Sequence, residues 1–460
     1  MIILLLLIPG LLGLAVCAAL WRLRAVYFGW GEKLALAFII GWGVHTIVMF
    51  LISLAGAPLT LATITMADLV IAAALLAYAY RKSGWTGWRP AAWNLPSLGG
   101  LALLLLIALK LFLVVWGAFL KPVLDPDIIS CYALGAKMIF LQKTVLVNGP
   151  WGDKPLMPFL SQAWTAIGLN TWNDTLLTLP NPLFYVSFLV IFYAALARYF
   201  KRWYALLATT LLATIPFLAY QAGTAYSDFA QALYYTLATI YLFLFVKEFK
   251  NNGEASAGYL MTGALLLGLS VWAKRSGLYY AAIDAAAVAA FIWTVRSALG
   301  KEDWQGLARS ALLLIATAAP WLLFNQLSTF RGYYVAPATL SPALPFNVTP
   351  RSWPVIAALF RNAFFEDNWH CLGLLAVAAL AFYPRQALGQ RRGFLSLVIA
   401  LQLICLFVLF RFTGNYKYIA TETLLNRLTF HFVPLILYYC AEVIGAGAAG
   451  ARPAPEEKQG

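Results

Sequence analysis

Two carboxylates on either side of a proline begin a polar stretch that could carry acid–base chemistry. The segment reads Leu-Asp-Pro-Asp, with Asp125 and Asp127 flanking Pro126. Proline fixes its own φ and favours an extended conformation at the residue before it, so the two acids are held stiffly. Asp127 also begins an apolar stretch of about 15 residues, which we expect to form a helix lying at a membrane interface. Asp127 is therefore a candidate general base, unless it is only the N-cap of that helix and Asp125 only a turn residue.

Charged side chains recur in four later segments, each before or between apolar runs. They are Lys154 in a Gly-Asp-Lys-Pro stretch, Asp228 after Tyr-Ser, the pair Lys274 and Arg275 in a short turn, and Arg427 just before the last apolar run. Lysine and arginine can bind a phosphate. The alternative interpretations are a snorkelling lysine, a helix N-cap, a turn made soluble by charge and an interfacial anchor, respectively.

The elements that position these residues are membrane-spanning helices. Of the 460 residues, 62% are hydrophobic and only 11% are charged, whereas a soluble domain has about 25% charged residues. Apolar runs of about 20 residues, the length of a spanning helix, recur along the whole chain, without the alternation of a β-barrel. We therefore predict an all-α polytopic transmembrane bundle with about thirteen spans, at residues 2–20, 34–55, 61–80, 99–120, 176–197, 203–221, 227–246, 257–273, 277–295, 307–327, 369–384, 393–412 and 428–448.

The positive-inside rule orients these spans with the N-terminus outside and the C-terminus in the cytoplasm. The loops that then fall inside carry most of the basic residues: Arg22, Arg24, Lys33, Arg81, Lys82, Arg89, Arg198, Lys201, Arg202, Lys247, Lys250, Arg296, Lys301, Arg309, Arg385, Arg391 and Arg392. The loops at 121–175, 328–368 and 413–427 fall outside. Residues 156–169 are apolar but too short to cross, so we expect a half-helix or re-entrant segment there.

This topology brings the candidate acids and cations to one face of the membrane. A carboxylate there could take a proton from an incoming hydroxyl while the cations hold a departing lipid phosphate. The net charge of +14 is explained by the cytoplasmic loops, so we predict no nucleic-acid partner. Three charges lie inside spans, and we expect Lys110 to pair with either Asp68 or Asp284.

We divide the chain into four parts on this basis. Residues 1–98 form an N-terminal three-span unit, 99–300 a catalytic transmembrane module, 301–451 a C-terminal transmembrane module with the 328–368 loop, and 452–460 a disordered tail. The five cysteines have no metal-site spacing. We expect no cofactor, although carboxylates such as the Asp-Pro-Asp pair are also the ligands that a divalent metal takes.

The order of these motifs resembles the GT-C membrane glycosyltransferases, nearest to their protein mannosyltransferase and lipid A aminoarabinose transferase group. An outer-loop aspartate precedes Tyr132-Ala-Leu and then Lys154-Pro-Leu. Tyr-Ser-Asp228-Phe is similar to that family's fourth-helix aspartate, and Asn-Arg427 before a proline-containing last span resembles its Arg-Tyr-x-x-Pro ending. The resemblance covers residues 99–300 and 413–440. Two departures are that Pro126 separates the acids and that leucine replaces the second proline of the family's Lys-Pro-Pro.

The resemblance implies an inverting glycosyltransferase of the bacterial inner membrane that uses a polyprenyl-phosphate-linked sugar. Its acceptor would be a glycan, lipid or protein at the outer face. The catalytic carboxylate would be Asp127 or Asp125. The donor phosphate would be bound by Lys154, Arg275 and Arg427, with supporting roles for Asp228, Tyr132 and Lys274.

Two alternatives stay open. An O-antigen ligase or polymerase would have an arginine-rich late outer loop, and the 328–368 loop has three arginines but also Glu366 and Asp367. A transporter or lipid flippase would favour inverted repeats and polar residues at the bilayer midplane, whereas no repeat is evident here.

Overall fold

The structure is a computed structural model that describes residues 2–21, 28–83, 97–147, 149, 151–249, 251, 253–328, 351–389 and 391–450. Several predictions concern residues outside these ranges. They are the disordered tail, most of the 328–368 loop and the loop residues Arg22, Arg24, Arg89 and Lys250.

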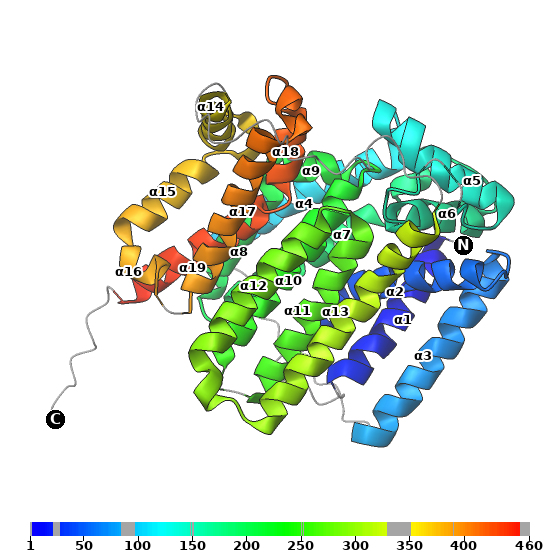
Figure 1. Cartoon of the computed structure of the whole chain (residues 1–460), viewed down its shortest axis with the longest axis horizontal. Coiled ribbons are helices and arrows are strands. Elements are labelled where there is room, and N and C mark those ends of the chain that lie inside the picture. The colour runs from blue at the N-terminus through cyan, green and yellow to red at the C-terminus, as the bar shows by residue number, and fades with distance from the viewer. Residues whose placement is uncertain are drawn as a thin grey trace.

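The described residues form helices and no strand, which confirms the predicted all-α bundle (Figure 1). Within them, ten segments are long and apolar enough to cross a membrane. The helices of these segments are α1 Ile2–Trp21, α2 Trp30–Leu54, α3 Leu61–Ser83, α4 Leu98–Leu120, α7 Asn181–Ala197, α10 Ser227–Glu248, α11 Gly253–Ala273, α12 Gly277–Val295, α13 Lys301–Leu327 and α17 Gly393–Phe412. The short 3₁₀ helices η2 Leu176–Thr178 and η3 Arg296–Ala298 lengthen the α7 and α12 spans.

Two further predicted spans are bent pairs of helices. The pair α8 Arg202–Thr214 and α9 Pro216–Ala222 is bent by 67°, and the pair α18 Thr423–Phe430 and α19 Val433–Gly450 by 47°. Counting each pair as one span gives up to twelve in the described ranges. The thirteenth predicted span, 369–384, contains α15 Leu372–Phe382, whose 11 residues extend only about 16 Å, against a hydrocarbon core of about 30 Å.

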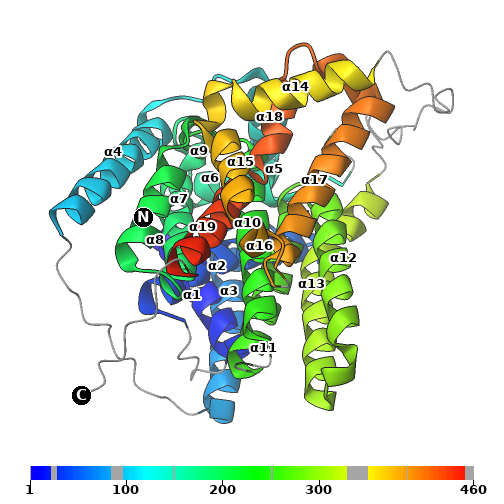
Figure 2. The same cartoon turned by 90° about the vertical axis from the view of Figure 1, so that its left-hand side faces the viewer.

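The remaining helices are short, and several lie near the bundle ends. They are η1 Ile128–Ala133, α5 Leu134–Gln142, α6 Met157–Leu169, α14 Ser352–Phe364, η4 Asp367–Trp369, α16 Pro384–Ala387 and η5 Gly414–Tyr418. Helix α6 occupies the predicted half-helix segment and has only 13 residues, too few to cross the hydrocarbon core. Helix α14 lies across the top of the bundle in Figure 2.

Helix α10 is the central helix of the bundle and α4 a peripheral one. Nearly every residue of α10 is buried, whereas α4 exposes large apolar side chains such as Leu105 and Trp116 along the outer edge seen in Figure 2. A helix that is apolar on all sides can face either protein or lipid. Its hydrophobicity alone therefore does not say which of the two it does.

Small residues allow α1 and α2 to pack at very short range. A Cβ atom at Gly13 would lie 1.8 Å from the carbonyl oxygen of Ala37, and one at Gly41 would lie 1.9 Å from that of Pro9. Small residues at crossing points let helix backbones approach closely, which strengthens packing where lipid provides no hydrophobic driving force. These contacts hold together two of the three helices of the predicted N-terminal unit.

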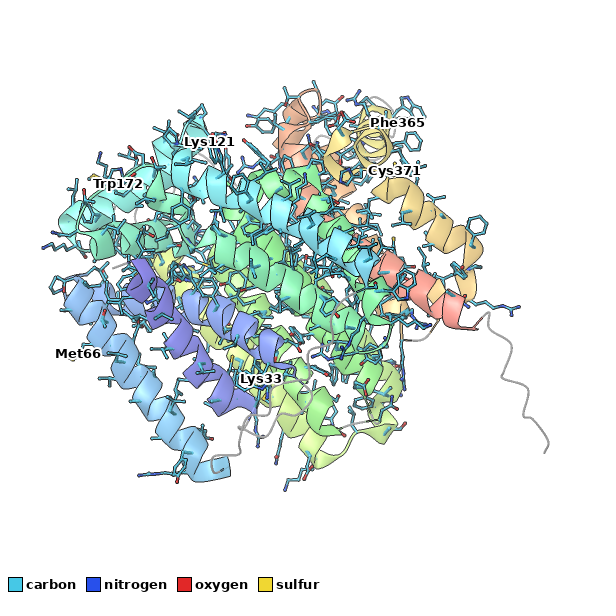
Figure 3. All side chains as sticks on the ribbon, turned by 180° about the vertical axis from the view of Figure 1, so that it is seen from behind. Lys33, Met66, Lys121, Trp172, Phe365 and Cys371 are labelled. Carbon is cyan, nitrogen blue, oxygen red and sulfur yellow. The ribbon has the colours of Figure 1, made fainter. Side chains whose placement is uncertain are left out.

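Charged groups gather at the two opposite ends of α10. At its C-terminal end, Lys247 Nζ lies 2.9 Å from an oxygen of Glu442, Arg392 lies 3.6 Å from the same carboxylate, and Arg198 pairs with Glu32. These basic residues are all predicted to be cytoplasmic. At its N-terminal end stands Asp228, which is predicted to be outside. Figure 3 likewise places Lys121, Phe365 and Cys371 near one end of the molecule and Lys33 toward the other.

The predicted pairing of Lys110 with an intramembrane aspartate is wrong. Asp68 instead lies 2.6 Å from His45 Nδ1, and Asp284 accepts hydrogen bonds from Tyr235 and Thr239. Lys110 is half-buried and has no ion pair with any residue in the described part of the chain. These pairs depend on which side of each helix faces its neighbours, and not on the depth of the residues in the membrane.

Candidate active site

The first acidic residue of the site begins the predicted interfacial helix. η1 and α5 run together from Ile128 to Gln142, as predicted. The side chain of Asp127 makes no capping hydrogen bond, so the N-cap alternative does not describe its carboxylate. That side chain is 66% exposed. Asp127 therefore presents an accessible carboxylate at the start of a helix whose first turns are π-helical, a distortion frequent at functional sites.

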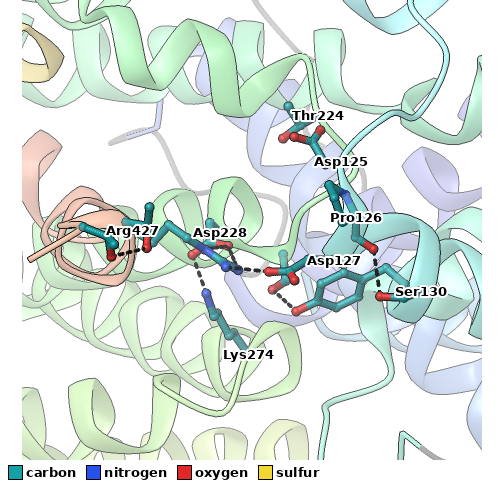
Figure 4. Close-up of polar contacts among 12 residues, drawn as sticks. Asp125, Pro126, Asp127, Ser130, Thr224, Asp228, Lys274 and Arg427 are labelled. Atoms are coloured by element: carbon teal, nitrogen blue, oxygen red, sulfur yellow. Dashed lines mark hydrogen bonds and ion pairs between the residues drawn. The ribbon is translucent and has the colours of Figure 1, made fainter. Parts of the chain in front are cut away.

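The second acidic residue, Asp228, is completely buried in the first turn of α10. Its Oδ1 atom accepts hydrogen bonds from Lys274 Nζ and from His431 Nε2, the latter at 3.0 Å. Its Oδ2 atom accepts from Arg427, at 2.9 Å from Nη2 and 3.2 Å from Nε (Figure 4). A buried carboxylate needs such partners to offset the loss of hydration. Because both of its oxygens are occupied, Asp228 organises the site and is not placed to accept a proton.

Arg427 connects the two acids. While its Nε and Nη2 atoms bind Asp228, its Nη1 atom lies 3.2 Å from Oδ2 of Asp127 (Figure 4). The guanidinium also lies over the ring of Tyr226, 4.7 Å from the centroid. A planar guanidinium can bind two carboxylates in this way because its donors point in several directions. Arg427 thus fixes the exposed acid relative to the buried one.

Lys274 contributes the second cation, from the turn between α11 and α12. Burial lowers the pKa of its ammonium to about 8, although the nearby Asp228 carboxylate raises it in part. Together Asp127, Asp228, Lys274 and Arg427 carry two formal negative and two formal positive charges. Their balanced arrangement allows charges to be held in a largely buried place.

Three further contacts fix the geometry of this cluster. The hydroxyls of Tyr132 and Ser227 lie 2.9 Å apart and join η1 to the start of α10. His431 lies 2.9 Å from the hydroxyl of Tyr280 through its Nδ1 atom. Sequence reasoning missed His431 as a site residue, although it stands four residues after Arg427. Residues at that spacing share one side of a helix, and this spacing was the available signal.

Asp125 does not join the cluster. Its carboxylate accepts a hydrogen bond of 3.2 Å from the hydroxyl of Tyr220 and is turned away from Arg427 in Figure 4. The carboxylates of Asp125 and Asp127, on either side of Pro126, point in different directions. The two carboxylates of the Asp-Pro-Asp motif therefore have different surroundings.

The remaining two predicted cations lie outside the ion-pair cluster. Lys154 Nζ lies 3.4 Å from Asp153. Arg275 is exposed next to Lys274 and has no ion pair with any residue in the described ranges. The expected convergence of Lys154, Arg275 and Arg427 on one phosphate stays a prediction.

No family model and no curated protein sequence matches the chain. Among solved structures, it is similar to ArnT from Cupriavidus metallidurans bound to undecaprenyl phosphate, with a TM-score of 0.53 and 14% identity over 78% of this chain and 61% of ArnT. It also aligns with the oligosaccharyltransferase AglB from Archaeoglobus fulgidus, in complex with an inhibitory peptide and a dolichol-phosphate. That match has a TM-score of 0.46 and 13% identity over 77% of this chain and 52% of AglB.

The chain shares its fold with ArnT over the aligned residues. This confirms the fold expected from the order of the sequence motifs. The chain spans about three fifths of the length of ArnT. The likeness concerns the arrangement of helices, so the activity and the roles of individual residues rest on the geometry of the site.

Proposed function

We propose that this protein is a membrane glycosyltransferase that moves a sugar from a polyprenyl-phosphate-linked donor to an acceptor at the outer face of the membrane. Asp127 would be the general base. The GT-C fold supports the reaction class. The residues support the chemistry, because an exposed carboxylate stands beside two cations that are held in place by a buried one.

The observation that carries the proposal is the contrast between Asp127 and Asp228. Asp228 is inaccessible and its oxygens bind three side chains, whereas Asp127 is exposed and binds only Arg427 among the described residues. A general base must be within hydrogen-bond reach of the proton that it takes. The exposed carboxylate of Asp127 is open to such a contact, whereas the enclosed carboxylate of Asp228 is not.

The reaction would invert the configuration at the sugar. The acceptor oxygen attacks the anomeric carbon, its proton passes to Asp127, and the bond between that carbon and the phosphate oxygen breaks with both electrons going to the phosphate. Arg427 and Lys274 would stabilise the charge that develops on the leaving group. Lys154 and Arg275, which lie outside the ion-pair cluster, would hold the phosphate before and after transfer.

Most of the rate would come from the position of the reactants and from the stabilised leaving group. We further propose a bacterial inner-membrane location with the site end outside, because basic residues gather at the other end of α10.

The test is transfer of labelled sugar from purified polyprenyl-phosphate donors by the full chain in lipid nanodiscs. Asp127→Asn keeps the shape of the residue and removes the base, so turnover should fall by about two orders of magnitude or more. Asp174→Asn, which alters another exposed acid of the same loop, is the matched control and should retain activity.

Asp125→Asn is measured beside these variants. If Asp125→Asn loses activity while Asp127→Asn keeps it, Asp125 is the base and the assignment is wrong. If both retain full activity, the acid pair has no part in transfer and the transporter or flippase alternative gains support.

A further inference from the structure

Three side chains bind the Asp228 carboxylate in the described part of the chain, and His431 differs from the other two. The side chains of Lys274 and Arg427 are 19% and 24% exposed, whereas that of His431 is 0% exposed. The two cations are therefore partly open to a ligand, and the imidazole is enclosed by protein. Any effect of His431 on a reaction must then pass through Asp228.

The two ring nitrogens of His431 have partners that a neutral imidazole can satisfy. Nε2 lies 3.0 Å from Oδ1 of Asp228. A carboxylate that binds two cations is ionised and only accepts hydrogen bonds, so Nε2 must carry a hydrogen. Nδ1 lies 2.9 Å from the hydroxyl of Tyr280, which can donate to an unprotonated nitrogen. The contacts are all made when the hydrogen of the ring is on Nε2 alone.

The charges around the imidazole favour this neutral form over the cation. Asp127, Asp228, Lys274 and Arg427 already balance, with two formal charges of each sign. A second hydrogen on His431 would add a third positive charge, and Asp228 is the only carboxylate of the described residues that lies within 4 Å of the ring. Like charges in a buried place oppose ionisation. His431 is therefore assigned as a neutral donor.

Tyr280 is itself held by a second layer of buried contacts. Its ring stacks on that of Tyr235, with 4.6 Å between centroids and 27° between planes. The hydroxyl of Tyr235 donates to Asp284 at 3.2 Å and accepts from Gln402. All four side chains are buried. Because satisfied buried networks are rigid, the hydroxyl that faces Nδ1 of His431 keeps its place.

This arrangement matters once a lipid phosphate enters the site. The ammonium of Lys274 has three donors, and its described contacts use one of them, on Asp228. The phosphate would attract Lys274 and Arg427 and would weaken their contacts with Asp228. A neutral donor is not drawn to the phosphate in this way. The hydrogen bond from His431 would therefore keep the carboxylate in place while the two cations bind the phosphate.

We propose that His431 is a positioning residue, a neutral donor kept in its Nε2–H form by Tyr280, which fixes the Asp228 carboxylate during transfer. The inference rests on the proposed function, because it concerns the same site. Binding of the donor lipid depends on the cations, whereas turnover depends on the geometry that Asp228 imposes on them in the transition state. Loss of the His431 donor should therefore lower kcat and change KM for the donor lipid little.

The first experiment determines the hydrogen positions by nitrogen NMR of the full chain in lipid bilayers with isotope-labelled histidine. The chain has only three histidines, so the signals missing from His431→Gln identify those of His431. At neutral pH we expect a protonated Nε2 and an unprotonated Nδ1. Tyr280→Phe should shift the Nδ1 signal and leave Nε2 protonated.

The second experiment compares His431→Leu and His431→Gln in the sugar-transfer assay. Leucine has no donor, and its kcat should fall by about ten- to a hundredfold, the range for a hydrogen bond to a charged group. The glutamine amide is a neutral donor of similar reach, so His431→Gln should recover most of the lost kcat. His45→Leu is the matched control. His45 is also fully buried and bound to an aspartate, Asp68, but far from the site in the α2–α3 contact; this variant should lose thermal stability and keep the kcat of the folded protein.

Tyr280→Phe provides a second kinetic test if His431→Leu does not fold. It removes one hydroxyl and should lower kcat by about two- to tenfold. The proposal is overturned if His431 carries hydrogens on both nitrogens at neutral pH, if His431→Leu keeps the wild-type kcat, or if His431→Gln loses as much kcat as His431→Leu. The NMR signals do not depend on transfer, so the two failures are distinct: full activity in Asp127→Asn refutes the proposed base and leaves the assigned state of His431 as the signals show it.

Discussion

Replacing Asp228 should damage the stability of the protein far more than replacing Asp127, although one arginine binds both. Asp228 is 0% exposed, and the side chains of Lys274 and Arg427 that contact it are only 19% and 24% exposed. In Asp228→Asn, two largely buried cations lose their shared counter-charge. Removal of one partner from a buried ion pair costs about 3–5 kcal/mol of unfolding free energy.

Asp127→Asn removes a much weaker contribution. The side chain of Asp127 is 66% exposed and its contact with Arg427 is 3.2 Å, and such surface pairs contribute about 0–1 kcal/mol. The stability of Asp127→Asn should therefore lie within about 1 kcal/mol of wild type, although its turnover falls. Chemical unfolding in one detergent, followed by tryptophan fluorescence, compares the two variants directly.

A double variant tests the electrostatic cause. Adding Lys274→Met to Asp228→Asn removes one uncompensated cation and leaves Arg427 paired with Asp127, so part of the lost stability should return. The reasoning is refuted if Asp228→Asn unfolds at the same denaturant concentration as Asp127→Asn. It is also refuted if the double variant is less stable than Asp228→Asn alone.

Three further outcomes are expected. The pKa of Lys274 is lowered to about 8, mainly by burial, so this residue is a cation below that pH and neutral above it. Transfer should therefore decline as the pH rises through about 8. Lys274→Arg should move this decline to higher pH, which a pH–rate profile measures. In a cysteine-free background, Thr171→Cys should react with an impermeant thiol reagent in intact cells and Leu388→Cys should not, and the reverse pattern would contradict the proposed orientation. Gly13→Ala should lower the unfolding free energy by about 1–3 kcal/mol, the usual cost of overpacking, because its new methyl group meets the α2 backbone. Gly10→Ala, in the same helix, is the control. Its methyl group meets nothing within 4 Å, so thermal stability should be nearly unchanged.

The sequence was informative about properties that depend on residues close together in the chain. Apolar length predicted the spans except 369–384, where α15 has only 11 residues, and it also separated the half-helix α6, with its 13 residues, from them. The 15-residue apolar helix after Asp127 was predicted in the same way. The basic residues predicted which loops share a side of the membrane, and the acidic residues Asp127 and Asp228 were candidates before any contact was known.

Only the tertiary structure decided which of these candidates meet. Lys274 and Arg275 are neighbours in one turn, yet only Lys274 binds Asp228. Successive residues of a turn point in different directions, and the packing of α11 and α12 against α10 determines which one faces inward. The amino-acid composition does not show how each helix is rotated about its own axis.

The same limit explains the pairings that sequence reasoning missed. Depth in the membrane favoured a partner for Lys110, whereas the rotation of α2 and α3 about their axes brought His45 to Asp68. His431 likewise meets Asp228 although the two residues are 203 positions apart in the sequence. The sequence by itself determined the lengths of the helices, the ends that carry charge and the kind of chemistry these charges could do. The tertiary structure decided which side chains share a site, because that depends on the rotation and crossing of helices whose apolar surfaces fit neighbours on almost any side.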